Sequence, residues 1–587
     1  MIKLIKRLNG KEVGWILSAT VFVFVQVFLD LKIPEFMSEI TTVLQTPNSN
    51  VSDILTPGLS MLSLSLASLA VSVFIGFSAA RVAASFSTRL RQNVFEKVID
   101  LSPAQVNEFS VSSLLTRTTN DITQITMLIA MGLQVVVKGP VMAVWAMSKI
   151  ADKNQAWLLL TSGAVLLIVS VLTVLLIFAF PKQRIAQTLT DKLNASLRAM
   201  LTGVRVVRAY NAERYEENKF EAVNTQLTDL NLYMQRLMAI MSPVMTLLMG
   251  GLTLGIYWIG AILINEAKLL DRLTLFTDMI VFSSYAMQVI FGFMMMMVIF
   301  FILPRALVSA RRINEVLDEP SRLQFGELVE SVANDKGSVI FKNVSFAYAD
   351  DAEKVLDNVS FEVKAGQTAA FIGSTGSGKS TLVNLIARFF DATEGEILIN
   401  HEPIANYTHE TLNNIVSYIP QKAILFSGTI DSNLMFGDSS ATPLHTQDKE
   451  RALSLAQALP FVQEKEDGLE SAVAQNGTNF SGGQRQRLTI ARALARKGDI
   501  IIFDDSFSAL DYKTDRVLRA QLAKETQGIT KLIVAQRIST IMDADLIVVL
   551  DEGKVVGQGT HKELLETNAV YQEIAYSQLS KEELSRG

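Results

Sequence analysis

The chain contains no cysteine and few histidines, and each shortage excludes a class of site. Among its 587 residues the absence of Cys excludes disulfide bonds, thiol catalysis and Cys-ligated zinc. The four histidines, at 401, 409, 445 and 561, show no H-x-x-x-H spacing, so a His-based metal site is not expected. The net charge is only −5, and no general basic field indicates nucleic acid as a partner.

Hydrophobic residues, by contrast, are abundant and unevenly placed. They make up 49% of the chain and the mean hydropathy is +0.30, although 19% of residues are charged. The surplus lies before about residue 305 and forms six apolar stretches, at about 13–36, 57–84, 126–148, 156–180, 243–265 and 275–303. Each is long enough to cross a hydrocarbon core of about 30 Å. These features predict a membrane half joined to a soluble half.

The charges before the first stretch predict its orientation. Four basic residues precede it, namely Lys3, Lys6, Arg7 and Lys11. Basic residues stay on the cytoplasmic side, and no small-residue cleavage pattern follows, so the stretch is expected to remain in the mature chain. Two long loops, about 85–125 and 181–242, have helical patterns and would extend the spans into the cytoplasm. Six crossings return the soluble half to the same side.

A glycine-rich loop dominates the soluble half. An apolar strand at 368–372 leads into a complete G-x-x-x-x-G-K-[ST] motif, and an apolar-striped helix follows. The phosphate loop, as residues 373–381 are called here, consists of Gly373, Ser374, Thr375, Gly376, Ser377, Gly378, Lys379, Ser380 and Thr381. Its glycines allow backbone N–H groups to approach phosphate oxygens, Lys379 supplies a charge for the β- and γ-phosphates, and Ser380 a hydroxyl for Mg²⁺. The motif predicts ATP and Mg²⁺ as ligands.

Two further segments have the chemistry of a phosphate site. The apolar strand 500–503 ends at Asp504, a carboxylate that can hold Mg²⁺ opposite Ser380. The signature segment, residues 480–484, is Phe480, Ser481, Gly482, Gly483 and Gln484, and it precedes an alanine- and arginine-rich helix. A serine and backbone amides at a helix N-terminus form a second anion site. Two such surfaces reach one nucleotide only when two domains face each other.

The strand pattern predicts an α/β domain. Apolar strand-like runs occur at 339–346, 359–363, 368–372, 396–400, 415–419, 500–503, 532–535 and 546–550. Helical patterns separate several of them, which favours a doubly wound sheet. We therefore expect a cytoplasmic segment at 1–12, a six-helix membrane domain at 13–320, a linker at 321–336 and a nucleotide-binding domain at 337–587.

These motifs together resemble the ATP-binding cassette exporters over nearly the whole chain. The resemblance implies that Tyr348 stacks on adenine and that Gln421 approaches Mg²⁺ with Ser380 and Asp504. It also implies that the dimer-interface loop, residues 508–511, is formed by Ser508, Ala509, Leu510 and Asp511. Segments 108–121 and 203–213 resemble the inner loops whose short helices dock on nucleotide domains. The implied fold is six transmembrane helices with long cytoplasmic extensions plus an α/β nucleotide-binding domain.

Two positions depart from the family pattern. The family's hydrolytic sites have a glutamate base after the strand-end aspartate, whereas this chain has Asp505. The switch histidine expected after strand 532–535 is replaced by Gln536. Aspartate is one methylene shorter than glutamate, and glutamine offers no ionisable imidazole. The pair resembles the weak, or degenerate, ATP site of a heterodimeric bacterial multidrug exporter, whose partner half-transporter would have Glu and His at these positions.

The sequence says less about a substrate site. The candidates for substrate contact are Gln26, Asp30, Gln288, Phe291 and Met295. An ionisable group at membrane depth is a functional candidate, so Asp30 is expected to bind a cation, to act in gating, or to pair with Lys32. The methionine run of the sixth stretch indicates either an adaptable apolar surface or plain packing and lipid-facing surface.

The sequence thus predicts an ATP-driven exporter subunit in a bacterial plasma membrane, with its N-terminus and nucleotide-binding domain in the cytoplasm. The expected partners are a second half-transporter, the lipid bilayer and a small amphipathic, drug-like or lipid-like substrate, with no nucleic acid. A dedicated lipid or peptide exporter, a non-transporting ATP-binding regulatory subunit and a slowly hydrolysing homodimer are the alternatives.

Overall fold

The computed structural model describes residues 1–45, 50–151, 155–268, 271–330, 336–349, 352–436, 444–580 and 584. The chain divides into two units. The membrane unit comprises Met1–Ile99 and Ser112–Glu319, and the nucleotide unit comprises Asp100–Val111 and Pro320–Gly587. Residues 331–335 of the expected linker lie outside the described residues.

The membrane unit is entirely helical in its described part. Its elements are α1 (Ile2–Ile5), α2 (Gly10–Gln45), α3 (Val51–Asp100), α5 (Val111–Thr116), η1 (Arg117–Asp121), α6 (Ile122–Gly132), η2 (Leu133–Val137), α7 (Lys138–Ala151), α8 (Gln155–Thr202), α9 (Val204–Ala209), α10 (Glu213–Glu266) and α11 (Arg272–Leu317). Within the described residues five helices are long and apolar enough to cross a membrane, and the number is six if the pair of helices bent by 44° at residue 133 is one span. The expected six spans correspond to these helices.

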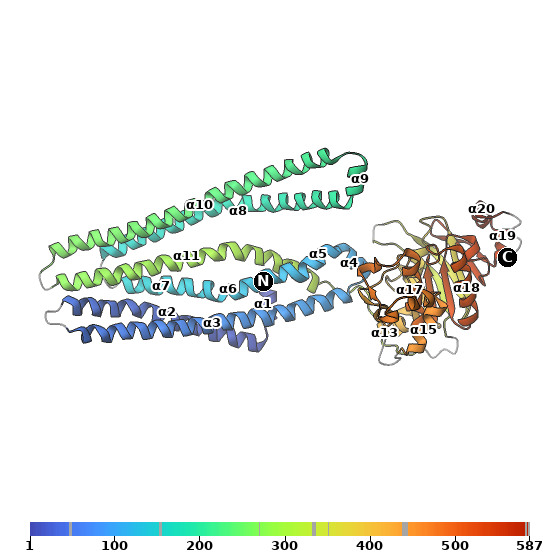
Figure 1. Cartoon of the computed structure of the whole chain (residues 1–587), viewed down its shortest axis with the longest axis horizontal. Helices are drawn as coiled ribbons and strands as arrows, with labels where there is room; N and C mark the ends of the chain where they lie inside the picture. The colour runs from blue at the N-terminus through green and yellow to red at the C-terminus, as the bar shows by residue number, and fades with distance from the viewer. Residues whose placement is uncertain are drawn as a thin grey trace. The chain divides into compact units, whose positions relative to one another are not determined.

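Helix α11 lies at the centre of this unit. It packs against α7, α10, α2 and α6, and in Figure 1 it runs between the α8–α10 pair and the other spans. Gly139 of α7 and Gly292 of α11 allow the two backbones to approach, because a Cβ on Gly292 would lie 2.8 Å from the Gly139 carbonyl oxygen. Small residues permit such close helix packing in membranes.

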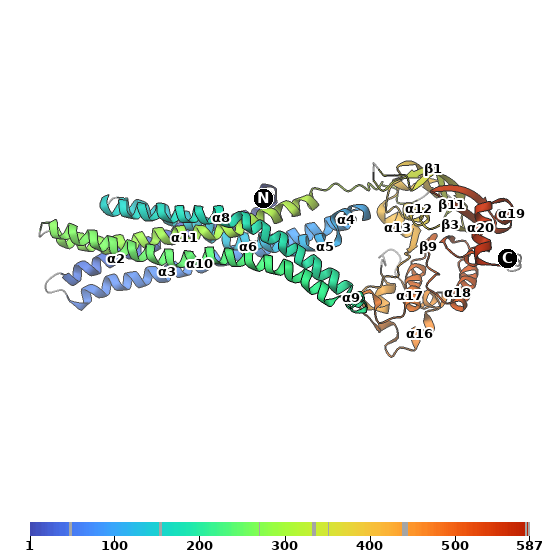
Figure 2. The same ribbon diagram turned by 90° about the horizontal axis from the view of Figure 1, so that it is seen from above.

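Helices α8 and α10 form a long antiparallel hairpin. The two helices pack against each other, and both views show α9 at the turn between them (Figures 1 and 2). Many large apolar side chains of α8 are exposed, among them Leu159, Leu166, Val174 and Ile177. A single chain therefore leaves this apolar surface to lipid or to another protein.

The nucleotide unit contains twelve strands among its described residues. They are β1 (Val339–Phe346), β2 (Leu356–Val363), β3 (Thr368–Gly373), β4 (Glu394–Ile399), β5 (Glu402–Pro403), β6 (Val416–Ile419), β7 (Gly428–Thr429), β8 (Ala472–Val473), β9 (Ile500–Asp504), β10 (Thr530–Val534), β11 (Leu546–Asp551) and β12 (Lys554–Gly559). The principal sheet has the order β12-β11-β3-β10-β9-β6, and all its pairings are parallel except β11 with β12.

The expectation of one doubly wound sheet was wrong for the first strands of the domain. Strands β2, β1, β4 and β5 pair in that order as a separate antiparallel sheet. The sequence pattern identifies strands but not their partners, because pairing is decided by contacts between distant segments. Strand β12 was not expected, because this exposed edge strand has no continuous run of apolar residues in its sequence.

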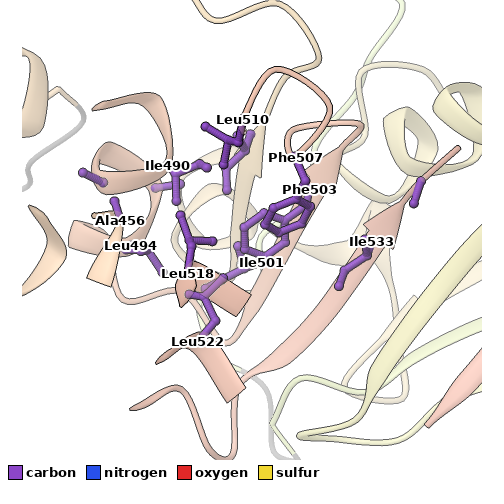
Figure 3. Packing of buried hydrophobic residues seen from close by; sticks show 14 of the residues in the cluster. Ala456, Ile490, Leu494, Ile501, Phe503, Phe507, Leu510, Leu518, Leu522 and Ile533 are labelled. Carbon is purple, nitrogen blue, oxygen red and sulfur yellow. The ribbon is translucent and has the colours of Figure 1, made fainter. Parts of the chain in front are cut away.

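Helices cover the principal sheet. The α-helices of this unit are α4 (Pro103–Phe109), α12 (Lys379–Ile386), α13 (His409–Ile415), α14 (Ile430–Leu434), α15 (Thr446–Leu455), α16 (Leu459–Gln463), α17 (Gly482–Ala495), α18 (Tyr512–Glu525), α19 (His561–Thr567) and α20 (Ala569–Gln578). Alternate residues of the central strands enter opposite cores. Ile501 and Phe503 pack with α17 and α18 on one face, as Figure 3 shows, whereas Ile500 and Ile502 pack with the second sheet on the other. Burial on both faces explains the uninterrupted apolar run of β9.

Candidate functional site

The principal sheet brings the chemically active segments to one edge. Strands β3, β10, β9 and β6 are parallel neighbours, so their carboxyl ends meet there. The phosphate loop follows β3, Gln536 follows β10, Asp505 follows β9 and Gln421 follows β6. Loops beyond the carboxyl ends of such strands are where open α/β sheets bind ligands. The topology therefore gathers residues that are far apart in the sequence.

Backbone conformation explains the glycines of the phosphate loop. Gly378 has φ +95° and forms the N-cap of α12, and a Cβ there would lie 2.6 Å from the Leu356 side chain. A side chain at Gly373 would collide with the Leu550 carbonyl group. Glycine alone adopts such a positive φ without strain and lacks the Cβ that would collide with these neighbours. The loop therefore turns tightly and leads its N–H groups to the helix N-terminus, where anions bind.

Lys379 is buried at the start of α12. Its Nζ donates to the carbonyl oxygens of Gly373 at 2.9 Å and Ser374 at 2.6 Å. Burial lowers the pKa of Lys379, and the negative charges of Asp505 and Asp504 oppose this effect. The ammonium group is thus held inside the curve of the phosphate loop, where its charge is only partly screened by water.

Asp504, at the end of β9, is also buried and is held by two hydroxyl groups. Ser380 Oγ donates to Asp504 Oδ1 at 2.9 Å, and the Tyr418 hydroxyl donates to Oδ2 at 3.0 Å. Burial raises the pKa of Asp504, whereas these hydrogen bonds and Lys379 act to lower it. A carboxylate and a serine hydroxyl side by side are hard oxygen donors of the kind that Mg²⁺ prefers, so these residues fit the ion that the motif predicts.

Asp505 and Gln536, the two departures from the family pattern, contact each other. Gln536 Nε2 donates to Asp505 Oδ2 at 2.9 Å, and Gln421 Nε2 reaches the same oxygen at 3.3 Å. Asp505 has φ +48°, an uncommon angle for a residue with a side chain. Burial raises the pKa of Asp505, the Gln421 hydrogen bond lowers it and nearby Asp504 raises it. The short carboxylate is therefore occupied by two amide donors.

Tyr348 lies beside the phosphate loop. Its hydroxyl is 2.9 Å from the Thr381 hydroxyl, and its ring packs edge-on against Phe346 and Phe390. The side chain is 51% exposed, so a ring face is accessible to a planar base. The adenine-stacking role of Tyr348 stays a prediction, which rests on the tendency of aromatic faces to stack on nucleobases.

The signature segment begins helix α17. Ser481 is its N-cap, with Gln484 N donating to Ser481 Oγ at 3.2 Å and Ser481 N donating to Gln484 Oε1 at 3.0 Å. Phe480 is buried in the core, whereas a Cβ on Gly482 would have no neighbouring atom within 4 Å. This capping box leaves the glycine face of the helix N-terminus accessible.

The dimer-interface loop connects the signature segment to Asp505. Ser508 Oγ donates to the Asp505 carbonyl oxygen at 2.8 Å, and Ala509 O approaches Gly483. Leu510 is buried, and Asp511 caps α18 by accepting from Thr514 N at 3.0 Å. A displacement of this loop would therefore change the surroundings of both Asp505 and Gly483.

In the membrane unit, Asp30 is paired with a residue that the sequence reasoning missed. Its Oδ2 lies 3.2 Å from Lys138 Nζ of α7, and Ser68 Oγ of α3 donates to its Oδ1 at 2.6 Å. The pairing with Lys32 was wrong, because Lys32 Nζ contacts Glu35 instead. Lys138 was visible as a charge inside the apolar stretch 126–148, although nothing local pairs it with Asp30.

The other candidate substrate residues do not form one cluster. Gln288 Nε2 donates to the Asp30 carbonyl oxygen at 3.2 Å, and its Oε1 is buried with no partner in the described part of the chain. Gln26 is buried, and Phe291 is 48% exposed. Met295 lies against Gly139, which places it in the contact between α7 and α11. This position agrees with packing for Met295.

The sequence matches known protein families over most of its length. Residues 16–294 match the model of the ABC transporter transmembrane region, and residues 356–508 match the ABC transporter model. An uncharacterized ABC transporter ATP-binding protein of Mycobacterium tuberculosis is 38% identical over 509 residues, or 86% of this chain and 85% of that protein. The chain belongs to the ABC transporter family.

Other relatives bear on the type of ABC transporter. An ATP-dependent lipid A-core flippase of Pseudomonas fluorescens is 32% identical over 494 residues, covering 84% of this chain and 80% of that protein. A solved bacterial Atm1-family ABC exporter with ATP bound superposes with a TM-score of 0.82 at 22% identity, covering 97% of this chain and 99% of that one. The second likeness shows the fold alone. The protein is a multi-pass membrane protein of the ABC transporter family that carries a transmembrane region and an ATP-binding domain in one chain, and the latter implies ATPase-coupled transport.

Proposed function

We propose that this ABC half-transporter is the weak-site subunit of a heterodimeric exporter. The observation that carries the proposal is the arrangement of Asp505, whose carboxylate accepts hydrogen bonds from both Gln536 and Gln421. A general base must reach within about 2.6–3.2 Å of the water that it activates. Asp505 is one methylene shorter than glutamate, and its Oδ2 is already engaged by amide donors. We therefore expect poor activation of water at this site.

The binding side of the same site supports retention of ATP. Lys379, Ser380 and Asp504 have the positions and partners described above, and Tyr348 offers an exposed ring. In our proposal Lys379 and the loop amides bind the phosphates of ATP, and Ser380, Asp504 and Gln421 hold the metal. Mg²⁺, when bound, supplies positive charge that screens the phosphate oxygens. The proposed result is a site that binds ATP and hydrolyses it slowly.

The signature segment supports a second role in the same assembly. Ser481 is the N-cap of α17 and Gly482 and Gly483 are its first two residues, so backbone N–H groups that can bind an anion lie at this helix N-terminus. We propose that this segment completes a competent site on the partner's phosphate loop. That partner would be a non-identical half-transporter with Glu and His at the positions of Asp505 and Gln536. Turnover would then occur at the partner's site while this chain's ATP holds the two nucleotide domains together.

The substrate proposal is an amphipathic compound, drug-like or lipid-like, moved outward across a bacterial plasma membrane. One relative is named as a lipid A-core flippase, which favours a lipid-like class. The Asp30–Lys138 pair provides a polar point among apolar spans, where a substrate headgroup or a gating change could be accommodated. The basic N-terminal residues support a cytoplasmic N-terminus and nucleotide-binding domain.

The test is to purify the full-length chain alone and measure ATP binding and ATP turnover separately. The proposal predicts saturable ATP binding with turnover far below that of an intact exporter, and restored turnover after a partner half-transporter is added. Turnover comparable with an intact exporter in the chain alone would refute the asymmetric assignment. Transport into vesicles by the two-chain complex then separates an exporter from a regulator, which predicts no transport.

A further inference from the structure

Tyr418 contacts the proposed metal site but belongs to none of the motifs that define it. It lies in β6, three residues before Gln421, and its hydroxyl donates to Asp504 Oδ2 at 3.0 Å. The opposite oxygen, Oδ1, accepts from Ser380 Oγ. Each oxygen of the Asp504 carboxylate is therefore fixed by a different hydroxyl group. The bond from Tyr418 is made to the oxygen that does not contact Ser380.

The position of the Tyr418 ring is determined separately from that of its hydroxyl. The ring is half-buried and packs edge-on against Phe389, with centroids 5.2 Å apart and an interplanar angle of 87°. Edge-to-face packing of this kind does not involve the hydroxyl group. Removing the oxygen should therefore leave the ring where it is. The substitution Tyr418→Phe can therefore measure what the hydroxyl group alone contributes.

The Tyr418 hydroxyl has two acceptors within reach and one proton. Asn384 Oδ1 of α12 lies 3.1 Å from it, nearly as close as Asp504 Oδ2. A phenol is protonated at neutral pH and donates one hydrogen bond. An ionised carboxylate is a much stronger acceptor than a neutral amide. The proton is therefore given mainly to Asp504, and Asn384 is the weaker, secondary acceptor.

We infer that Tyr418 is a positioning residue that holds the Asp504 carboxylate in the orientation required for Mg²⁺. A carboxylate bound at only one oxygen can rotate about its Cβ–Cγ bond, whereas one bound at both cannot. The Tyr418 hydrogen bond therefore keeps Oδ1 beside Ser380 without occupying it. Hydrogen-bond partners of metal ligands typically change metal affinity by about 10–100-fold when they are removed.

The location of Tyr418 extends this role to Gln421. Strand β6 ends at Ile419, and Gln421 follows with its amide directed at Asp505. Tyr418 therefore ties the start of the Gln421 segment to Asp504 of the neighbouring parallel strand. A movement of that segment would alter the support of the metal ligand. The inference rests on the proposed Mg²⁺ site at Ser380 and Asp504, but not on the weak hydrolysis proposed for Asp505.

The experiment uses equilibrium binding of a fluorescent ATP analogue to the full-length chain, titrated with Mg²⁺ and repeated in excess chelator. For Tyr418→Phe we expect the Mg²⁺ concentration that gives half of the binding response to rise by about tenfold. Binding in chelator should remain within about twofold of the unsubstituted chain, because the phosphate loop is unchanged. If the role of Tyr418 were purely structural, Tyr418→Phe would instead weaken nucleotide binding both with Mg²⁺ and in chelator, or would lower the thermal unfolding midpoint.

Two variants make the outcome unambiguous. Asn384→Ala removes the weaker acceptor and should leave the Mg²⁺ midpoint unchanged. Ser380→Ala removes a proposed metal ligand and should abolish most of the Mg²⁺ response. If Ser380→Ala retains the full response, the proposed metal site is wrong. If Ser380→Ala loses it and Tyr418→Phe behaves like the unsubstituted chain, the site stands and the inference about Tyr418 is overturned.

Discussion

The two sides of the nucleotide site are built differently. On the binding side, Lys379 and Asp504 are buried, and their polar atoms are held by loop carbonyls and hydroxyl groups. On the water side, Gln536 is exposed and Asp505 is half-buried, and Gln421, which we also assign to the metal, is the residue that reaches across to Asp505. The parts that would hold ATP and the parts that would activate water share one sheet edge but few contacts. One function can therefore be lost while the other is kept.

Energetics explains why the two sides tolerate change so differently. Removing one partner of a buried, charged hydrogen bond leaves the other unsatisfied, at a cost of about 1–3 kcal/mol or more. Substitutions at exposed positions usually change stability by about 0.5 kcal/mol or less. Aspartate and glutamine on the water side therefore do not endanger the fold. Equivalent changes at Lys379 or Asp504 would disturb a buried cluster.

The largest expected effect comes from breaking the binding side. Lys379→Ala should weaken ATP binding by about 10–100-fold, because hydrogen bonds to charged groups contribute about 1.5–3 kcal/mol. Isothermal titration with ATP in Mg²⁺ buffer measures the change. Lys524→Ala, at an exposed position in α18, is the matched control and should bind normally. Unchanged affinity in Lys379→Ala would show that the phosphate loop does not hold the nucleotide.

Repairing the water side should have the next largest effect. The double variant Asp505→Glu with Gln536→His should raise steady-state ATP turnover by about tenfold or more, a part of the factor of about 10²–10⁴ that general-base catalysis contributes. Each single variant should give less, because the two side chains contact each other. Phosphate release is the assay. No gain in the double variant, with ATP binding intact, would place the deficit elsewhere.

The signature segment should matter more than the water side in the assembled exporter. Ser481→Ala should lower turnover of the two-chain complex by about fivefold, the effect of losing a hydrogen bond worth about 1 kcal/mol. Ser481 also caps its helix, so Thr560→Ala, which removes the corresponding cap of α19, controls for stability. Equal effects of the two variants would indicate a structural role only.

The smallest effect is expected for removal of Asp505 itself. If Asp505 contributes little as a base, Asp505→Ala should change turnover of the two-chain complex by about twofold or less, within the range of ordinary surface substitutions. The same phosphate-release assay measures it, with Asp504→Ala as a contrasting variant that should also lose the Mg²⁺ dependence of binding. A large loss of turnover in Asp505→Ala would mean that the short carboxylate is an active base.

Much of the binding side could be predicted from the sequence because it is local. The phosphate loop is a continuous motif between a strand and a helix, and β3 and α12 lie where the pattern placed them. Asp504 could be predicted because an apolar strand ends in a carboxylate. The six spans were likewise visible, since length and apolar composition are properties of each stretch alone.

What the sequence could not provide were contacts between distant segments. The division of the strands between two sheets, the Asp30–Lys138 pair and the Tyr418–Asp504 hydrogen bond each join residues that no local pattern relates. The meeting of Asp505 and Gln536 is of the same kind, although both positions stood out as departures from the family pattern. Only the parallel register of β9 and β10 places them together.

The most direct measurement of the central claim is a single-turnover experiment on the purified chain. The full-length chain is loaded with radiolabelled ATP in Mg²⁺ buffer, free nucleotide is removed, and the bound nucleotide is analysed over time. Our account predicts that the bound label is released mainly as intact ATP, and that the double variant Asp505→Glu with Gln536→His releases mainly ADP. Rapid conversion of bound ATP to ADP by the unsubstituted chain would contradict it.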